Sequence, residues 1–564
     1  MSSGRAGARV VVAAALLVVS SSVSTGCGQH RPPRVRGSDA PVTISQEQQS
    51  AWVRNFNPLL PPGRARWPTR DGVYEPLYIY NPFAKGGGAW TPWLATSYTW
   101  SPDLLHLRFT LREGVKWSDG APFTAADVTY TFEIMKRSPA LDQQHVWGFL
   151  ASVDAVDAMT VDFTFSRPYV PGMEDLAPQP IIAKHVFEKV ADPLTFTNPS
   201  PVGTGPFTEV KVFRDQVYEL GRNPHYWQAG KPKVSGIRFL AYTSNDQANV
   251  ALAMGDIDWS ANFVPAVDRT FVARDPKHRT SWSPLVGAMA LLFCNNQHKP
   301  FDDVRVRKAF SMAIDRERVV SVAMYGMTRP ADATGLTDSY LGWHDDAAGD
   351  RPWMKHDVAA AEKLLDEAGC KRGAGGLRHC ADGKPLDFDI EVVSGWSDWV
   401  RAAQLIARDL GAVGVNVHLR TYEFGAWMSR LQQGSFDLSV GYSMDGPTPY
   451  RIYRFMMSSK LVKPLGELTT LNWHRFGDPQ ADALLEEFEK AGGVDQQHAI
   501  AVKLQERFAD TFPVIPLFAN PLWGEYSTER FIGFPGPENP YARLSPNAEP
   551  DPLFTLVSLE PRPN

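Results

Sequence analysis

The sequence predicts an α/β protein of several domains, because strand-like and helix-like patterns alternate irregularly along its 564 residues. At about 150 residues per domain, two to four domains are expected. The clearest pattern is an apolar strand at 386–393, a helix at 399–410 and a strand at 415–419. This order favours a parallel sheet, since parallel neighbours need a helical crossover. Shorter strands are predicted at 107–111, where apolar and polar side chains alternate, and at 217–220.

Three further helices are predicted from their periodicity and their end signals. The first spans 125–136, with Thr124 as its N-cap and Asp127 in its first turn, where a carboxylate faces free backbone N–H groups. Residues 303–321 are expected to form one long helix with an inward apolar stripe. The third helix spans 358–368 and ends at a glycine.

The N-terminus has the features of an export signal. Two arginines precede an apolar run at 10–19, which is too short to span a bilayer but typical of a signal-peptide core. We therefore expect residues 1–26 to be a signal peptide. The small residues before Cys27 resemble the bacterial lipobox, which predicts lipidation of Cys27, with ordinary cleavage as the alternative. Residues 27–40 are then a flexible tether on the outer face of the bacterial cell membrane.

Composition and missing motifs narrow the function. The 57 basic and 62 acidic residues give a net charge of −5, which argues against a nucleic-acid partner. The chain contains no GxxxxGK[ST], HExxH or GxSxG motif, so P-loop hydrolysis and two common hydrolase chemistries are not predicted. An exported chain without a recognisable catalytic motif is more readily interpreted as a binder than as an enzyme. The rival class is an exported glycoside hydrolase, whose two carboxylates have no fixed sequence spacing.

The cysteines point to structural roles. Cys370 and Cys380 flank a flexible loop and could close a disulfide in an oxidising compartment. Cys294 ends an apolar run and is expected to be a buried thiol. No His or Cys pair has the spacing of metal ligands, so neither a metal nor another cofactor is expected.

Six sequence blocks, in order, carry a resemblance to a known family. They include LRFTLREGVKWSDG at 107–120 and lie at 94–132, 203–227, 255–259, 301–316, 361–369 and 512–517. With these blocks the chain resembles the extracellular solute-binding proteins of family 5, the oligopeptide-type receptors of ABC importers. The resemblance covers nearly the whole chain after the predicted signal peptide.

This resemblance implies a two-lobed, type II periplasmic-binding-protein-like fold with an extra third domain and a two-strand hinge. Lobe I is then expected at 41–80, 200–285 and 515–564, the extra domain at 81–199, and lobe II at 286–514. Ligand would be held between the lobes of a monomer. The implied partners are an ABC permease and its ATPase, and the chain itself would not be an enzyme. A sensor or chaperone that kept the receptor fold is a third class.

One ligand class is an oligopeptide. Peptide-binding members of the family hold the peptide amino terminus with an Asp, and Asp445 falls at the matching position, while Tyr442 stands where those members have Trp. A desolvated ammonium needs a carboxylate partner, because leaving it unpaired costs about 3–5 kcal/mol. The alternative is that Asp445 caps the turn at Gly446 and Pro447.

The other ligand class is an oligosaccharide, which we favour. Trp396 and Trp399 lie at a strand-to-helix turn, where ligands meet α/β sheets, and Trp427, Asn472 and Trp473 add rings and polar groups. These blocks look like the cello-oligosaccharide-binding branch of the family. Indole rings stack on the flat C–H faces of a glucan, and polar side chains bind its hydroxyl groups. For each Trp, the alternative is packing in the core.

Overall fold

The computed structural model describes most of the chain. The described residues are 40–46, 48–60, 72–84 and 89–563. The predicted signal peptide, Cys27 and nearly all of the tether lie outside them. The chain divides into two units, 1–35 and 36–564, and every described residue belongs to the second. Among the described residues, no helix is both long and apolar enough to cross a bilayer.

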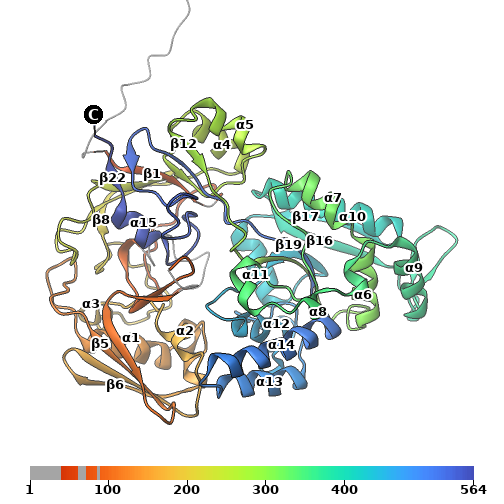
Figure 1. Cartoon of the computed structure of the whole chain (residues 1–564), viewed down its shortest axis with the longest axis horizontal. Coiled ribbons are helices and arrows are strands. Elements are labelled where there is room, and N and C mark those ends of the chain that lie inside the picture. Colours follow the sequence, from red (N-terminus) through yellow and green to blue (C-terminus); the bar gives the residue numbers. More distant parts are fainter. Residues whose placement is uncertain (1–39, 47, 61–71, 85–88, 564) are drawn as a thin grey trace, which may run out of the picture. The chain divides into compact units, whose positions relative to one another are not determined.

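A seven-stranded sheet forms the centre of lobe I (Figure 1). Its order is β12 (Arg279–Ser281), β20 (Glu525–Ser527), β11 (Trp259–Ser260), β1 (Val42–Ser45), β10 (Gly236–Leu240), β9 (Val217–Arg222) and β8 (Phe207–Arg214). Strand β1 runs parallel to β10 and β11, and the other pairs are antiparallel. The predicted strand at 217–220 is confirmed within β9. Three distant parts of the sequence therefore build one sheet.

An antiparallel four-stranded sheet, packed against one helix, forms the centre of the extra domain. The sheet order is β4 (Ala95–Trp100), β5 (His106–Leu111), β7 (Thr160–Phe165) and β6 (Leu150–Asp157), and the helix is α1 (Ala125–Arg137). Strand β5 confirms the strand predicted at 107–111. The predicted cap of α1 is also confirmed, because the Asp127 carboxylate accepts a hydrogen bond from the Thr124 N–H at 2.9 Å.

A five-stranded sheet forms the centre of lobe II. Its order is β17 (Asn416–Tyr422), β16 (Asp387–Val393), β18 (Leu438–Tyr442), β13 (Met289–Cys294) and β19 (Ile515–Ala519). Strands β16 and β17 are parallel and are joined by α10 (Ser397–Ala412), which confirms the predicted β-α-β order. Strand β19 pairs with β13 in this sheet, although the expected boundary assigned residues 515–519 to lobe I. The buried run of β19 completes the second sheet before the chain returns to the first.

The chain crosses between the two sheets twice, at 282–288 and at 520–524. The crossing segments hydrogen-bond to each other: Trp282 N–H donates to Gly524 O at 2.8 Å, and Leu522 N–H donates to Pro284 O at 3.1 Å. These two segments form the two-strand hinge.

The predicted long helix at 303–321 is wrong, because it is broken in the middle. Helix α6 (Val304–Ala313) ends at Ile314, whose backbone is extended. Asp315 then caps the short helix α7 (Arg316–Arg318), and a π-helical turn follows at 319–323. An Asp competes with the helix for backbone N–H groups, which explains the break. Helix α9 (Val358–Glu367) confirms the third prediction, and Gly369 after it has φ of +84°.

The remaining elements complete the layers around the sheets. The helices are α2 (Gly172–Leu176), α3 (Lys184–Phe187), α4 (Asn245–Ala253), α5 (Val267–Thr270), α8 (Asp346–Gly349), α11 (Phe424–Gln433), α12 (Tyr450–Met457), α13 (Pro479–Glu489), α14 (Val494–Thr511) and α15 (Pro552–Ser558). The short strands are β2 (Tyr78–Asn81), β3 (Ala89–Pro92), β14 (Lys371–Arg372), β15 (Arg378–His379), β21 (Phe531–Ile532) and β22 (Glu560–Pro561).

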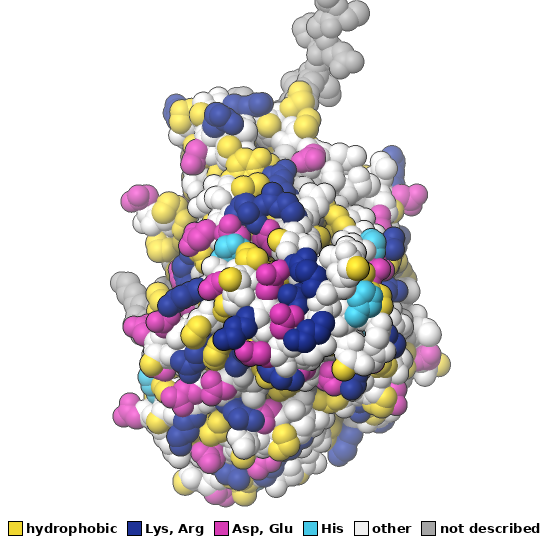
Figure 2. Space-filling model, turned by 90° about the vertical axis from the view of Figure 1, so that its right-hand side faces the viewer, with side chains coloured by type: hydrophobic (Ala, Val, Ile, Leu, Met, Phe, Trp, Pro, Cys, Tyr) yellow, Lys and Arg dark blue, Asp and Glu magenta, His cyan; other side chains and the backbone are white. Residues whose placement is uncertain are grey.

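Opposite charges are interspersed on the surface of lobe II (Figure 2). Exposed pairs such as Lys460–Glu486 and Arg420–Asp389 lie at 2.6 and 3.0 Å. Each such exposed pair contributes at most about 1 kcal/mol to stability.

The structure joins Cys370 to Cys380 by a disulfide across the β14–β15 hairpin, and leaves Cys294 as a buried thiol. Burial raises the pKa of the Cys294 thiol to about 12, so it is protonated at neutral pH.

Replacing both Cys370 and Cys380 with Ala is expected to lower the free energy of unfolding by about 2–3 kcal/mol, because the cross-link restricts the unfolded chain. Urea unfolding of the variant and of the unmodified protein measures this. Treating the unmodified protein with a reductant should reproduce the shift and leave the variant unaffected. An unfolding midpoint that does not respond to reductant contradicts the prediction.

Candidate functional site

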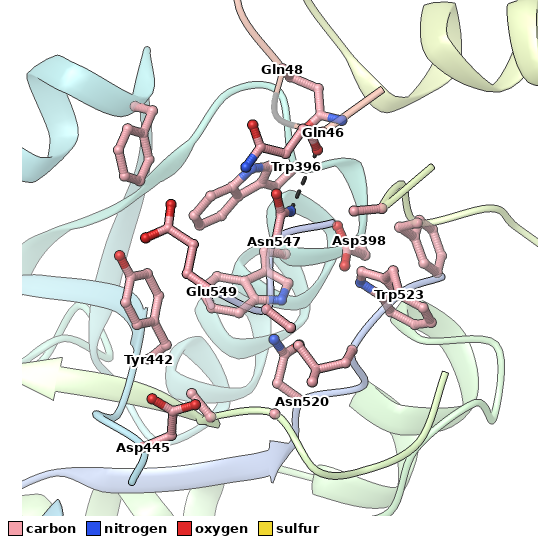
Figure 3. A pocket seen from close by; sticks show the side chains of 18 of the residues that line it. Gln46, Gln48, Trp396, Asp398, Tyr442, Asp445, Asn520, Trp523, Asn547 and Glu549 are labelled. Carbon is pink, nitrogen blue, oxygen red and sulfur yellow. Dashed lines mark hydrogen bonds between the residues drawn. The ribbon is translucent and has the colours of Figure 1, made fainter. Parts of the chain in front are cut away.

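A cavity of about 510 Å³ is lined by residues of both lobes and of the hinge (Figure 3). Lobe I contributes Gln46, Gln48, Gln49, Leu60, Asn245, Ala261, Phe263, Arg543, Asn547, Ala548 and Glu549. Lobe II and the hinge contribute Gly287, Ala288, Trp396, Asp398, Trp399, Phe424, Tyr442, Ser443, Met444, Asp445, Asn520, Leu522 and Trp523. This volume is within the usual range for small-molecule sites.

Trp396 and Trp399 enter the cavity from the turn between β16 and α10. Their ring centroids are 5.0 Å apart at 79°, and the Trp399 ring lies 6.4 Å from that of Tyr442. The preceding Gly395 touches lobe I, since a Cβ at this position would lie 2.8 Å from Gln48 Cβ. Only a residue without a side chain lets this turn approach the other lobe so closely.

A second aromatic group faces the cavity from the opposite lobe. The rings of Phe263 and Trp523 lie 5.3 Å apart at 63°, and Trp523 belongs to the hinge segment. Neither residue lies in a sequence pattern that marks it as part of a site. Their position depends on the hinge crossing, which no local pattern predicts. Aromatic rings thus line the cavity from both lobes.

Amide side chains lie between these aromatic groups (Figure 3). The Asn547 amide donates to Gln46 O at 3.4 Å, and the Gln48 amide donates to Asn262 Oδ1 at 3.1 Å. Asn520 adds a further amide from the hinge. These groups can donate and accept hydrogen bonds without carrying charge.

Asp398 is a buried carboxyl in the lining, on the first turn of α10. Burial raises the pKa of this carboxyl to about 7, although backbone N–H groups of Trp399 and of Asp398 itself lower it. The Asn245 side chain of lobe I lies 3.5 Å from Asp398 Oδ1, and the Asn245 N–H donates to Gly395 O at 3.2 Å. The turn that carries the two Trp residues therefore contacts lobe I through polar groups as well.

Asp445 pairs with Arg543 across the cleft, at 3.0 Å between Oδ2 and Nη1. Arg543 is also held by Asp551, which accepts from Nε at 3.0 Å and from Nη2 at 2.9 Å. Burial alone would lower the pKa of the Arg543 guanidinium, but the carboxylates of Asp551 and Asp445 raise it above its ordinary value. The Asp445 side chain remains 52% exposed. It can therefore contact a ligand while it is paired.

Four predicted residues line the cavity: Trp396, Trp399, Tyr442 and Asp445. The other three, Trp427, Asn472 and Trp473, do not line it.

The reason is that the polar groups of these three side chains are used inside lobe II. Trp427 Nε1 donates to Ser439 Oγ at 3.0 Å, and Trp473 Nε1 donates to Thr470 O at 3.0 Å. The Asn472 amide donates to Ser458 O at 3.0 Å, from a residue with φ of +52°. For these three residues, the structure supports packing in the core.

No metal site accompanies the cavity in the described part of the chain, where no three His, Cys, Asp or Glu side chains are placed to hold an ion. The rings and amides of the lining offer stacking and hydrogen bonding.

The chain matches one family model and is similar to known binding proteins. A family model described as bacterial extracellular solute-binding proteins, family 5 (middle), matches residues 89–461. The chain is 27% identical over 522 residues to di/tripeptide-binding protein 2 of Pseudomonas aeruginosa, which covers 87% of this chain and 91% of that protein. It is also 27% identical over 437 residues to the nickel-binding periplasmic protein of Escherichia coli, with 74% and 78% covered.

Solved structures match over nearly the whole chain. A periplasmic oligopeptide-binding protein of an ABC transporter from Thermotoga maritima, crystallised with mannohexaose bound, has a TM-score of 0.85 and 28% identity, with 93% and 99% covered. An oligopeptide-binding protein of Bacillus subtilis, in complex with a nonapeptide, has a TM-score of 0.80 and 20% identity, with 94% and 100% covered. The expected two-lobed fold is thereby confirmed.

Asp398→Asn is expected to stabilise the protein more at high pH than at low pH. The carboxyl ionises near its ordinary pKa when unfolded but at about 7 when folded, so the unmodified protein loses stability as pH rises toward 7. The difference in free energy of unfolding between variant and unmodified protein should grow by about 2–3 kcal/mol from pH 5 to pH 8.

Urea unfolding at the two pH values measures this difference. An Asp398→Asn effect of equal size at pH 5 and pH 8 contradicts the prediction.

Proposed function

Because the chain belongs to the bacterial extracellular solute-binding proteins of family 5, we propose that it is the substrate-binding lipoprotein of an ABC importer. It captures an oligosaccharide of the cello type between its lobes and delivers it to a membrane permease. A separate ATPase drives release, and the chain itself performs no catalysis. Lipidation at Cys27 holds it on the outer face of the cell membrane.

The observation that carries the sugar proposal is the aromatic lining of the cavity on both sides. Trp396 on lobe II and Trp523 in the hinge are the partly exposed rings, and Trp399 and Phe263 lie buried beside them. Flat rings stack on the C–H faces of pyranose units, while amides and carboxyls at the rim bind equatorial hydroxyls. The Thermotoga maritima neighbour, named as an oligopeptide-binding protein, has mannohexaose bound in its crystal structure, which supports a sugar ligand on this fold.

Capture follows from the division of the lining between two lobes. A ligand that contacts both lobes binds the closed form better than the open form, so it shifts the population toward closure. Micromolar capture requires about 8 kcal/mol of net binding free energy. Stacked rings and hydrogen bonds in a cleft that excludes water can provide this.

The second candidate ligand is an oligopeptide, favoured by Asp445 in the lining. The half-exposed carboxylate would pair with a peptide amino terminus. The similarity to di/tripeptide-binding protein 2 supports a peptide ligand. Arg543 already donates to this carboxylate, so an ammonium would have to share it with a guanidinium.

Titration followed by tryptophan fluorescence separates the two ligands. The sugars to be tested are cellobiose, cellohexaose and mannohexaose, and at least one of them should change the emission. A tripeptide should leave the emission unchanged. Trp396→Ala should weaken sugar binding by about 2 kcal/mol, roughly thirtyfold, because the stacked ring is lost.

Trp353→Ala is the matched control for this titration, because Trp353 packs under Lys308 in lobe II and does not line the cavity. It should bind sugar as the unmodified protein does. A response to the tripeptide alone, lost in Asp445→Ala, would replace the sugar proposal by the peptide one.

A further inference from the structure

The turn at 445–448 carries Asp445 into the cavity lining and is contacted from outside lobe II at two places. On one side, Arg543 of lobe I donates to Asp445 at 3.0 Å. On the other side, Glu174 of the extra domain accepts a hydrogen bond from Thr448 Oγ1 at 2.7 Å. The turn is therefore held from the opposite side of the cleft by two groups.

Glu174 packs directly on this turn. A Cβ at Gly446 would lie 3.3 Å from Glu174 Oε2, which is closer than an ordinary van der Waals contact, so helix α2 lies close against the turn. Within lobe II, the Tyr340 hydroxyl donates to Gly446 O at 2.9 Å and accepts from the Gly446 N–H at 2.8 Å. The turn is thus fixed between a tyrosine of its own lobe and a carboxyl of the extra domain.

Further polar groups of the extra domain and of lobe II meet beside the turn. Asp175, next to Glu174 on α2, lies 3.7 Å from Arg451 and 3.9 Å from Arg454, both on α12. Arg451 Nη2 donates to Gln144 Oε1 of the extra domain at 2.9 Å. The extra domain is joined by the chain to lobe I, so these contacts must separate whenever the two lobes move apart.

Glu174 is only 6% exposed, and its Oε2 has no hydrogen-bond partner among the residues that the structure describes. The charged groups that face it are Asp175 on its own helix and Arg451 on α12. The Glu174 carboxyl also interacts electrostatically with the phenols of Tyr80 on β2 and of Tyr340. The carboxyl therefore loses its hydration when the cleft closes, and few hydrogen bonds or positive charges replace that hydration.

We propose that Glu174 is a positioning residue for ligand capture: it fixes the 445–448 turn when the cleft closes, and it takes up a proton in doing so. It does not line the cavity, so it acts on ligand only through the turn. This proposal rests on one part of the proposed function, namely that closure of the cleft captures a ligand.

The direction of the pH effect follows from the two states. With the lobes apart, the carboxyl is in water and ionises near its ordinary pKa of 4.5; in the closed contact, burial raises the pKa to about 8. Between these values, closing takes up a proton. The ratio of closed to open protein therefore falls by up to about tenfold per pH unit as pH rises toward 8.

Small-angle X-ray scattering of the full chain without ligand, at pH 6 and pH 8.5, tests this. The radius of gyration of the unmodified protein should be larger at pH 8.5. Glu174→Gln, which is neutral at both pH values, should reduce this difference. Glu75→Gln is the matched control. Glu75 is also a buried carboxyl, and burial raises its pKa to about 7. Its hydrogen-bond partners Trp93, Tyr226 and Trp227 all lie outside lobe II. It should keep the pH response.

A second variant covers the case in which Glu174→Gln does not fold. Thr448→Val removes the hydroxyl that donates to Glu174, and should enlarge the radius of gyration at both pH values. A radius that does not depend on pH in the unmodified protein, or a pH response of unchanged size in Glu174→Gln, overturns the proposal. No ligand is added in this experiment, so its result does not depend on whether cellohexaose or a tripeptide binds. Failure of the sugar proposal can therefore be distinguished from failure of the Glu174 proposal.

Discussion

The paired crossing of the chain between its two sheets is the constraint on which the rest of the structure depends. Segments 282–288 and 520–524 hydrogen-bond to each other, so the two lobes share one narrow connection instead of one continuous sheet. Each lobe is therefore built on its own sheet, and the space between the two sheets can change. The same crossing puts Trp523 and Asn520 into the cavity, so the hinge itself forms part of the lining.

The chemistry of the cleft divides into two parts with different tasks. The cavity is lined by rings and amides, which suit a ligand with flat apolar faces and many hydroxyl groups. Around it, polar contacts join opposite sides of the cleft: Asn245 with Gly395, Arg543 with Asp445, and Glu174 with Thr448. Polar surfaces stay well solvated when they separate, which is the behaviour that a cleft opening and closing in water requires. Buried carboxyls such as Asp398 make these contacts sensitive to pH.

Local patterns in the sequence predicted the parts of the fold that local energetics decide. The cap at Thr124, the β-α-β order around α10 and the helix ended by Gly369 all depend on neighbouring residues, and all are confirmed. The helix break at Ile314 was missed because Asp315 looks like an ordinary helix residue until its carboxylate is seen to cap the next turn. In the site, Trp396 and Trp399 could be predicted because a strand-to-helix turn positions them. Trp427 and Trp473 could not be distinguished from them, since only the tertiary partners of their indole N–H groups show that they are buried.

The central claim is that this chain closes around an oligosaccharide and returns it chemically unchanged. Native mass spectrometry after prolonged incubation with cellohexaose tests it most directly. The account predicts a complex of one protein chain with one sugar of unaltered mass, and no complex with a tripeptide under the same conditions. Shorter sugars released over time, or a complex formed only with the tripeptide, would contradict it.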